Sequence, residues 1–154
     1  MANDNYGTAP AVRVLVVEDF EPFRGLICSM LRKMPGLQIV GEVSDGLEAV
    51  RKAENLQPDL ILLDVGLPTL DGIEAARRVH NLAPASRIVF VTLESDKELM
   101  REAFNFGTRG WVVKTRVARD LLTAVDAALE GRQFVSSGLL AQEFATQTTT
   151  ASVN

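Results

Sequence analysis

Short and nearly unbroken apolar runs recur along the chain from residue 12 onward, and a stretch with helical spacing follows each of them. The runs at 12–17, 59–64 and 87–92 are apolar at almost every position. Strands of this kind are buried on both faces, as in the centre of a parallel sheet covered by helices. The runs at 37–43 and 109–114 are also rich in strand-forming residues. The sequence therefore predicts five strands.

Helical spacing and capping residues predict a helix after each strand. Pro22 suits the first turn of the first helix, whose apolar residues recur at i, i+3, i+4 and i+7. Asp45, Asp71, Ser95 and Thr115 are placed to cap the four helices that follow. The predicted helices cover 22–34, 46–56, 72–82, 96–106 and 116–130. Strands alternating with helices over about 120 residues predict a doubly wound α/β fold with right-handed crossovers.

Composition excludes several classes of protein. A length of 154 residues suits one domain, and a net charge of −4 argues against a chain that wraps nucleic acid. A single cysteine, Cys28, excludes an internal disulfide and a Cys-rich zinc site, and its apolar neighbours indicate a buried thiol. The sequence has neither a signal-peptide start nor an apolar run that could span a bilayer. We therefore expect a soluble, cytoplasmic protein that binds neither nucleic acid nor a membrane.

The two ends of the chain are predicted to lie outside the domain. Residues 1–10 form an N-terminal extension, and 11–131 form the domain. Residues 132–154 are predicted to contain a short helix over 134–144 and then a flexible tail, because the last ten residues are polar and uncharged. Met1 and the untagged tail favour a complete short protein.

Polar residues stand where four of the predicted strands end. Glu18 and Asp19 follow the first strand, Asp64 ends the third, Thr92 the fourth and Lys114 the fifth. Ligands of open α/β sheets bind at the carboxyl ends of the strands, so these five side chains are expected to meet at one edge. Carboxylates that meet there repel one another unless a cation joins them or their pKa values rise.

The chemistry of this set of residues points to phosphoryl transfer. Ligands that are all oxygen, with no His or Cys among them, favour a hard ion and Mg²⁺ above all. A carboxylate beside Mg²⁺ can attack phosphorus, while the metal, Lys114 and Thr92 neutralise charge on the phosphoryl oxygens. The sequence therefore predicts that Asp64 is a phosphoryl acceptor.

The same residues resemble a known family, the response-regulator receiver domain of two-component signalling. The resemblance covers about residues 11–131, and the matching residues stand in the family's order and spacing: Glu18, Asp19, Asp64, Pro68, Asp71, Gly72, Thr92 and Lys114. The stretches "GWVVKT" and "EGRQFVSSGLLAQEF" are most similar to receivers of the nitrate-regulator type, which usually precede a helix-turn-helix domain. The resemblance implies a flavodoxin-like fold with a five-stranded parallel sheet in the order 2-1-3-4-5.

For the metal, the resemblance implies that Asp19 and Asp64 ligate Mg²⁺ directly, together with the backbone carbonyl oxygen of Gly66. Glu18 would bind the ion through water. The phosphoryl group would come to Asp64 from a sensor histidine kinase. The protein would assist its own phosphorylation and dephosphorylation without being a turnover enzyme.

For the switch, the resemblance implies that Lys114 pairs with the phosphoryl group and that Thr92 moves inward to hydrogen-bond it. Trp111 occupies the family's aromatic switch position, with a ring larger than the usual Tyr or Phe. The surface of the fourth helix, fifth strand and fifth helix would then repack. An unknown protein partner would read that surface, and phosphorylation could also bring two copies together as a homodimer.

Taken singly, several of these residues have a purely structural explanation. Asp19 could cap the helix that begins near Pro22, and Thr92 and Lys114 fit ordinary strand ends. Their joint occurrence at one predicted sheet edge favours a site instead. His80 stands on a polar stretch and is predicted to lie on the surface.

Two alternative functions accompany the prediction of a stand-alone signalling switch. The chain could be the receiver half of a truncated DNA-binding transcriptional regulator; residues 132–154 are too few for a helix-turn-helix domain. A Mg²⁺-dependent phosphohydrolase with Asp64 as nucleophile is less favoured. Haloacid-dehalogenase-type enzymes place a second acid two residues after the nucleophile, where this chain has Gly66, and they carry a cap domain that it lacks.

Overall fold

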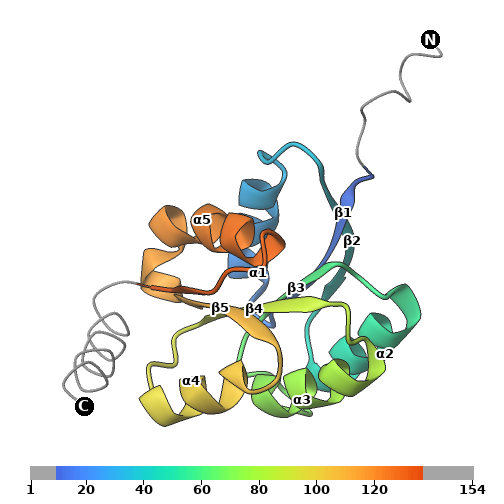
Figure 1. Ribbon diagram of the computed structural model, residues 1–154, viewed down its shortest axis with the longest axis vertical. Helices are drawn as coiled ribbons and strands as arrows, with labels where there is room; N and C mark the ends of the chain where they lie inside the picture. Colours follow the sequence, from blue (N-terminus) through green and yellow to red (C-terminus); the bar gives the residue numbers. More distant parts are fainter. Residues whose placement is uncertain (1–9, 137–154) are drawn as a thin grey trace.

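The computed structural model describes residues 10–136, which form a parallel β-sheet between two layers of helices (Figure 1). The strands are β1 (Val12–Val17), β2 (Leu37–Val43), β3 (Leu60–Leu63), β4 (Arg87–Thr92), β5 (Thr108–Val113) and β6 (Phe134–Val135). The helices are α1 (Glu21–Leu31), α2 (Gly46–Leu56), α3 (Gly72–Leu82), α4 (Lys97–Phe104) and α5 (Val117–Leu129). The strand order is β2-β1-β3-β4-β5-β6, with every pair parallel. The predicted doubly wound fold and its 2-1-3-4-5 order are confirmed, with a sixth strand added at the end.

The hydrophobic core lies on both faces of the sheet. Helices α1 and α5 cover one face, and α2, α3 and α4 cover the other (Figure 1). Strand β3 is buried at all four positions, as its continuous apolar run predicts. Cys28 is buried between α1 and the sheet, and burial raises the pKa of its thiol to about 11. This cysteine is therefore a structural residue, as predicted.

Two of the four predicted capping residues are confirmed, and two are wrong. Asp45 and Asp71 each accept a hydrogen bond from the backbone N–H three residues on, at 2.8 and 3.0 Å. Asp96, not Ser95, caps α4, because its carboxylate accepts from two N–H groups of the first turn. Thr115 lies within a 3₁₀ turn over Lys114–Arg116, so α5 begins only at Val117 and has no side-chain cap.

The sixth strand corrects the prediction for the segment after α5. Phe134 and Val135 pair with Gly110 and Trp111 of β5, where a helix over 134–144 was predicted. Two residues are too short a run to show strand periodicity, so the pairing is fixed by the edge of β5 rather than by the local sequence. Residues 137–144, like the predicted tail and residues 1–9, lie outside the described residues.

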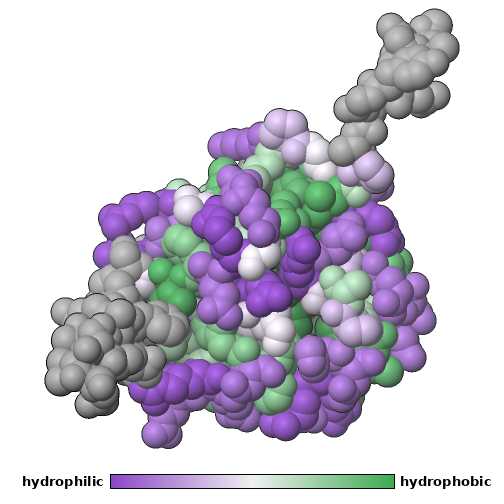
Figure 2. All heavy atoms as spheres, in the orientation of Figure 1, coloured by the Kyte–Doolittle hydropathy of each residue, from purple (hydrophilic) through white to green (hydrophobic). Residues whose placement is uncertain are grey.

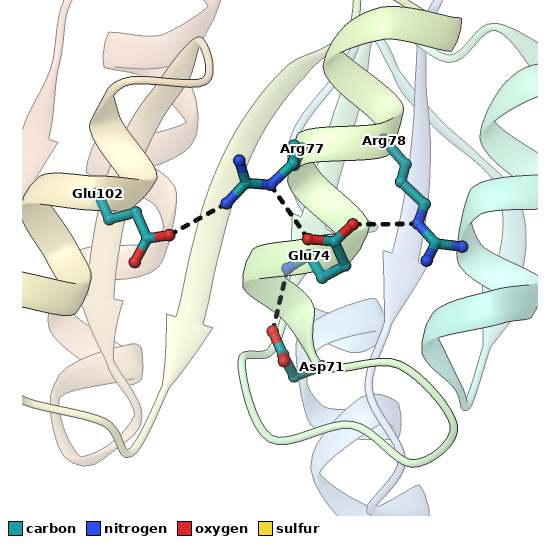
Figure 3. Close-up of polar contacts among 5 residues, drawn as sticks. All are labelled: Asp71, Glu74, Arg77, Arg78 and Glu102. Carbon is teal, nitrogen blue, oxygen red and sulfur yellow. Dashed lines mark hydrogen bonds and ion pairs between the residues drawn. The ribbon is translucent and has the colours of Figure 1, made fainter.

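Charged residues gather on α3 and α4, along the lower edge of the molecule, where Figure 2 shows a mainly hydrophilic surface. The Arg77 guanidinium lies 3.0 Å from Glu74 on its own helix and 3.2 Å from Glu102 on α4 (Figure 3). It also lies 4.7 Å from the centre of the Phe106 ring. Arg78 pairs with the other oxygen of Glu74 at 3.2 Å. This exposed cluster therefore connects the two helices.

None of the helices between residues 10 and 136 is both long enough and apolar enough to cross a membrane.

Candidate functional site

The predicted site residues meet at one edge of the sheet. Glu18 and Asp19 follow β1, Asp64 follows β3, Thr92 ends β4, and Lys114 opens the 3₁₀ turn after β5. Because the strands are parallel, their carboxyl ends bring these residues together across a large sequence separation. One carboxylate oxygen from each of the three acids lies within 4.8 Å of the others.

The ammonium group of Lys114 joins two of these acids. Its Nζ lies 2.8 Å from Glu18 Oε1 and 2.9 Å from Asp64 Oδ2. Glu18 is 1% exposed and Asp64 is 6% exposed, so the two carboxylates are compensated chiefly by this one cation. Among the described residues, this is a buried charged cluster with its positive charge at the centre.

Burial and charge change the proton affinity of the cluster. Desolvation raises the pKa of Glu18, and the nearby charge of Asp64 adds to that effect. Burial alone would lower the pKa of Lys114, but its hydrogen bonds to Glu18 and Asp64 outweigh burial and raise it. Lys114 therefore stays charged at neutral pH, where it can attract an anion.

The residues after β1 hold Glu18 in place and leave Asp19 open to solvent. Glu18 Oε2 accepts from the backbone N–H of Phe20 at 3.0 Å, and Arg24 donates to the Glu18 carbonyl oxygen at 2.8 Å. Asp19 is exposed, and the N-cap position of α1, directly before Glu21, is held by Phe20, which makes no side-chain capping bond. The capping explanation for Asp19 is therefore wrong, which leaves its carboxylate for the acidic cluster.

A tight turn after Asp64 fixes the backbone of the predicted phosphoryl acceptor. Gly72 N–H donates to the Val65 carbonyl oxygen at 2.7 Å, so the start of α3 lies against the turn. A Cβ atom at Gly72 would collide with the carbonyl oxygen of Asp64, and only glycine allows this approach. The backbone N–H of Gly66 points toward Asp64 Oδ1 at 3.4 Å, a long contact.

Asp64 is buried and lines a pocket together with Thr92 and Lys114, the groups predicted to assist it. The lining residues are Asp64, Val65, Gly66, Thr92, Leu93, Glu94 and Lys114. The Thr92 hydroxyl is buried and accepts from the Glu94 N–H at 3.1 Å. Leu93 also lines the pocket, and this residue is 68% exposed, so it leaves the pocket open to solvent on its side.

Trp111, on β5, is fully buried, as its alternation with Val112 suggests. Its indole N–H donates to the Glu94 carbonyl oxygen at 3.2 Å, so its one polar group has a partner. Its ring packs against Phe90 with the ring centres 5.3 Å apart. The large indole is therefore accommodated inside the domain, in contact with Glu94 of the turn that follows Thr92.

Two residues at the site have no signal in the sequence. Glu94 provides the backbone contacts to both Thr92 and Trp111, and backbone groups cannot be recognised from residue type. Phe23 places its ring 4.8 Å from Lys114 Nζ, a cation–π contact between α1 and the end of β5. Such a contact depends on how the helix packs. His80 is exposed on α3, in agreement with the prediction that it lies on the surface.

The donor set fits a hard divalent cation. Glu18, Asp19 and Asp64 offer only oxygen atoms, and they bring three negative charges together. The exposed Asp19 leaves one side of the cluster open to water, which Mg²⁺ retains in part when it binds proteins. Lys114 already neutralises part of this charge, so a cation here would bind beside the ammonium group.

Comparison with known proteins gives a consistent result. A family model for the response regulator receiver domain matches residues 14–126. The chain is 32% identical to the response regulator GacA of Pseudomonas viridiflava over 143 residues, which is 93% of this chain and 66% of that protein. It is 30% identical to the nitrate/nitrite response regulator protein NarL of Escherichia coli strain K12 over 126 residues, which is 82% of this chain and 58% of that protein.

Solved structures agree with the curated relatives. A two-component response regulator of the LuxR family from Aurantimonas sp. SI85-9A1 has a TM-score of 0.82 and 31% identity, with 90% of this chain and 99% of that chain covered. This chain spans only 58% to 66% of the length of the two curated relatives, and corresponds to their receiver portion. The chain belongs to the response regulator receiver domain family, whose members act in phosphorylation-dependent signalling.

Proposed function

We propose that this chain is a cytoplasmic signalling switch in which Asp64 accepts a phosphoryl group from a sensor histidine kinase. The observation that carries the proposal is the pairing of a buried Asp64 with Lys114 at 2.9 Å, in a pocket that Thr92 also lines. Family membership adds that receivers of this kind take part in signalling rather than in ordinary turnover.

The proposed reaction uses a carboxylate oxygen of Asp64 as the nucleophile. A new O–P bond forms on Asp64 while the N–P bond of a phosphohistidine breaks, and the leaving imidazole keeps the electron pair and takes up a proton. Lys114 pairs with the transferred phosphoryl group, and the Thr92 hydroxyl turns from Glu94 N–H to donate to it. The same residues assist the later hydrolysis, in which a water oxygen attacks phosphorus, the Asp64 O–P bond breaks and inorganic phosphate leaves.

Mg²⁺ is the proposed cofactor. Asp19, Asp64 and the backbone carbonyl oxygen of Gly66 would hold the ion directly, and Glu18 would hold it through water. When bound, the ion neutralises negative charge on the carboxylates and on the phosphoryl oxygens. Without it, three acids and an incoming phosphoryl group would face only the charge of Lys114.

Phosphorylation of Asp64 is tested by incubating the protein with Mg²⁺ and acetyl phosphate and measuring its intact mass. We expect one added phosphoryl group in the parent protein and none in Asp64→Asn. The matched control is Asp59→Asn, because Asp59 flanks the other end of the same strand, where its carboxylate accepts from Arg13 N–H at 2.8 Å. Omission of Mg²⁺ should reduce the yield in both the parent and the control.

The proposal fails if Asp64→Asn is labelled as fully as the parent protein under the same conditions. Equal loss of labelling in Asp64→Asn and Asp59→Asn would point to unfolding rather than to the loss of the acceptor, and circular dichroism separates these two cases.

The proposed output surface is the face formed by α4, β5 and α5. A downstream protein, or a second copy of the chain after phosphorylation, would bind there. Because β6 pairs with the edge of β5, any such partner meets α4, α5 and β6 rather than an open strand edge. No direct contact of this chain with nucleic acid is proposed.

A second candidate is the receiver portion of a longer DNA-binding transcriptional regulator. The observation in its favour is that the chain spans 58% to 66% of the length of GacA and NarL. The reading frame after residue 154 distinguishes this candidate from a stand-alone switch.

A further inference from the structure

The last described residues of the chain are attached to the backbone on either side of Val112. The backbone N–H of Ser136 donates to the Trp111 carbonyl oxygen at 2.9 Å. The Ser136 hydroxyl accepts from the Val113 N–H at 3.0 Å. Ser136 is fully buried, although it lies at the edge of the sheet. This serine therefore closes β6 onto β5 with both its backbone and its side chain.

The side chains of β6 contact both faces of the sheet. Phe134 packs against the apolar cluster beneath α1 and α5. Val135 packs against the opposite cluster, which contains Trp111. The pairing of Val135 with Trp111 in the strand register brings the two residues into direct apposition. A change in the position of the indole therefore acts on β6 through packing as well as through the backbone.

An unbroken series of hydrogen bonds runs from the pocket to Ser136. The Thr92 hydroxyl accepts from Glu94 N–H at 3.1 Å, and the Glu94 carbonyl oxygen accepts from the Trp111 indole at 3.2 Å. The Trp111 carbonyl oxygen then accepts from Ser136 N–H at 2.9 Å. Each residue in the series contacts the next directly. A movement of Thr92 would remove the partner of the Glu94 N–H, and the Glu94 carbonyl oxygen is the partner of the Trp111 indole.

We propose that β6 and Ser136 form a releasable clasp that passes the state of Asp64 to the part of the chain after residue 136. The inference rests on the proposed function, because phosphorylation of Asp64 provides the signal. When Thr92 turns toward the phosphoryl group, Glu94 loses its hydroxyl partner, the indole repacks, and the clasp on β5 loosens. Output then travels along the chain itself, in addition to any surface that a separate partner reads.

The size of β6 suits this role. A strand of two residues has few hydrogen bonds and only half-buried side chains, so it can open without unfolding the domain. Central strands such as β3 lack this freedom because they are paired on both sides. A switch element must have two arrangements of similar free energy, and a short edge strand is well suited to this.

The clasp is tested by amide hydrogen exchange of the full chain, in Mg²⁺ alone and in Mg²⁺ with beryllofluoride as a mimic of the phosphoryl group. We expect exchange at the Ser136 and Val113 amides to become at least about fivefold faster on activation, while amides in β3 remain unchanged. Fluorine NMR shows independently whether beryllofluoride is bound. Bound beryllofluoride with unchanged or slower exchange at these two amides overturns the clasp.

A second arm needs no activation. Ser136→Ala removes the acceptor of Val113 N–H, so that amide should exchange faster and the emission of Trp111, the sole tryptophan, should shift. Thr123→Ala is the matched control, because it deletes a hydroxyl from the exposed side of α5. Equal behaviour of the two variants overturns the clasp, and circular dichroism verifies that both are folded.

The two arms separate the clasp from the proposed function. If beryllofluoride and acetyl phosphate both fail to react with the folded protein, the proposed function is wrong and the clasp has no phosphoryl signal to carry, which also overturns the relay. If both reagents modify the protein but Ser136→Ala behaves like Thr123→Ala, only the clasp is wrong.

Discussion

Two clusters of the same kinds of charged groups lie in very different surroundings in this protein. At the strand ends, Lys114 contacts Glu18 and Asp64 at 2.8 and 2.9 Å, and the exposed fractions of these three side chains are only 13%, 1% and 8%. On α3 and α4, Arg77 contacts Glu74 and Glu102 at 3.0 and 3.2 Å, with 36% to 47% of each side chain exposed (Figure 3).

Contact distance does not distinguish the two clusters, but burial does. Water and salt screen the exposed ion pairs, so forming or breaking one of them changes the free energy of unfolding only a little. In the buried cluster, charges interact through a medium of lower dielectric and cannot be replaced by water. Glu18 accordingly has a raised pKa. The buried cluster can therefore respond to a new phosphoryl group or cation, while the exposed one serves to connect two helices.

The largest expected effect comes from removing the cation of the buried cluster. Lys114→Gln leaves Glu18 and Asp64 without their shared positive charge, and we expect the metal-free protein to lose about 3 kcal/mol of unfolding free energy. Urea denaturation measures this loss. Mg²⁺ should restore part of it, because the ion supplies positive charge beside the same carboxylates. A loss of unfolding free energy smaller than that caused by breaking the exposed Arg77 pairs would contradict the importance of burial.

A smaller effect is expected from the exposed cluster. Arg77→Gln breaks the ion pair between α3 and α4 and should lower the free energy of unfolding by about 0.5–1 kcal/mol. High salt should make this difference smaller, because it already weakens the pair in the parent protein. Arg78→Gln is the matched control, because between residues 10 and 136 the ion-pair partner of Arg78 is Glu74, and in Figure 3 its side chain points away from Glu102. Arg78→Gln should lower the free energy of unfolding less than Arg77→Gln does in the same denaturation experiment. Equal losses in the two variants would mean that the contact of Arg77 with Glu102 contributes nothing to stability.

The smallest effect on stability, with the opposite sign, is expected at Asp19. Asp19→Ala removes one of three neighbouring negative charges, so the metal-free protein should become more stable by about 0.5 kcal/mol. The same variant should lose most of the rise in melting temperature that Mg²⁺ gives the parent protein. Thermal unfolding with and without Mg²⁺ tests both expectations. A parent-like response to Mg²⁺ would show that Asp19 is not a metal ligand.

Much of the fold was predictable because its central strands are buried on both faces and its outer strand β2 is rich in strand-forming residues. The runs at 12–17, 37–43 and 87–92 agree residue for residue with β1, β2 and β4. The meeting of Asp64 with Lys114 was also predictable, since parallel strands bring their carboxyl ends to one edge. These features follow from patterns within single segments combined with one rule of topology.

The remaining features depend on contacts between segments. Ser95 and Asp96 are equally good capping residues by type, and the choice of Asp96 follows from how Glu94 holds the turn before α4. The link from Arg77 to Glu102 requires the distance between two helices. Strand β6 exists only because β5 offers an edge, so its two residues have no signal of their own.

The close approach of Gly72 to the Asp64 backbone has a consequence for mutational scanning. If Asp64 is the phosphoryl acceptor proposed above, we expect substitutions at both positions to score as inactive in a library scored only by signalling activity. Asp64 variants would still accumulate as folded protein, whereas any side chain at Gly72 forces α3 away from the turn and lowers the amount of folded protein. A scan that records cellular abundance as well as activity would therefore identify Asp64 as a residue needed for the reaction and Gly72 as a residue needed for folding.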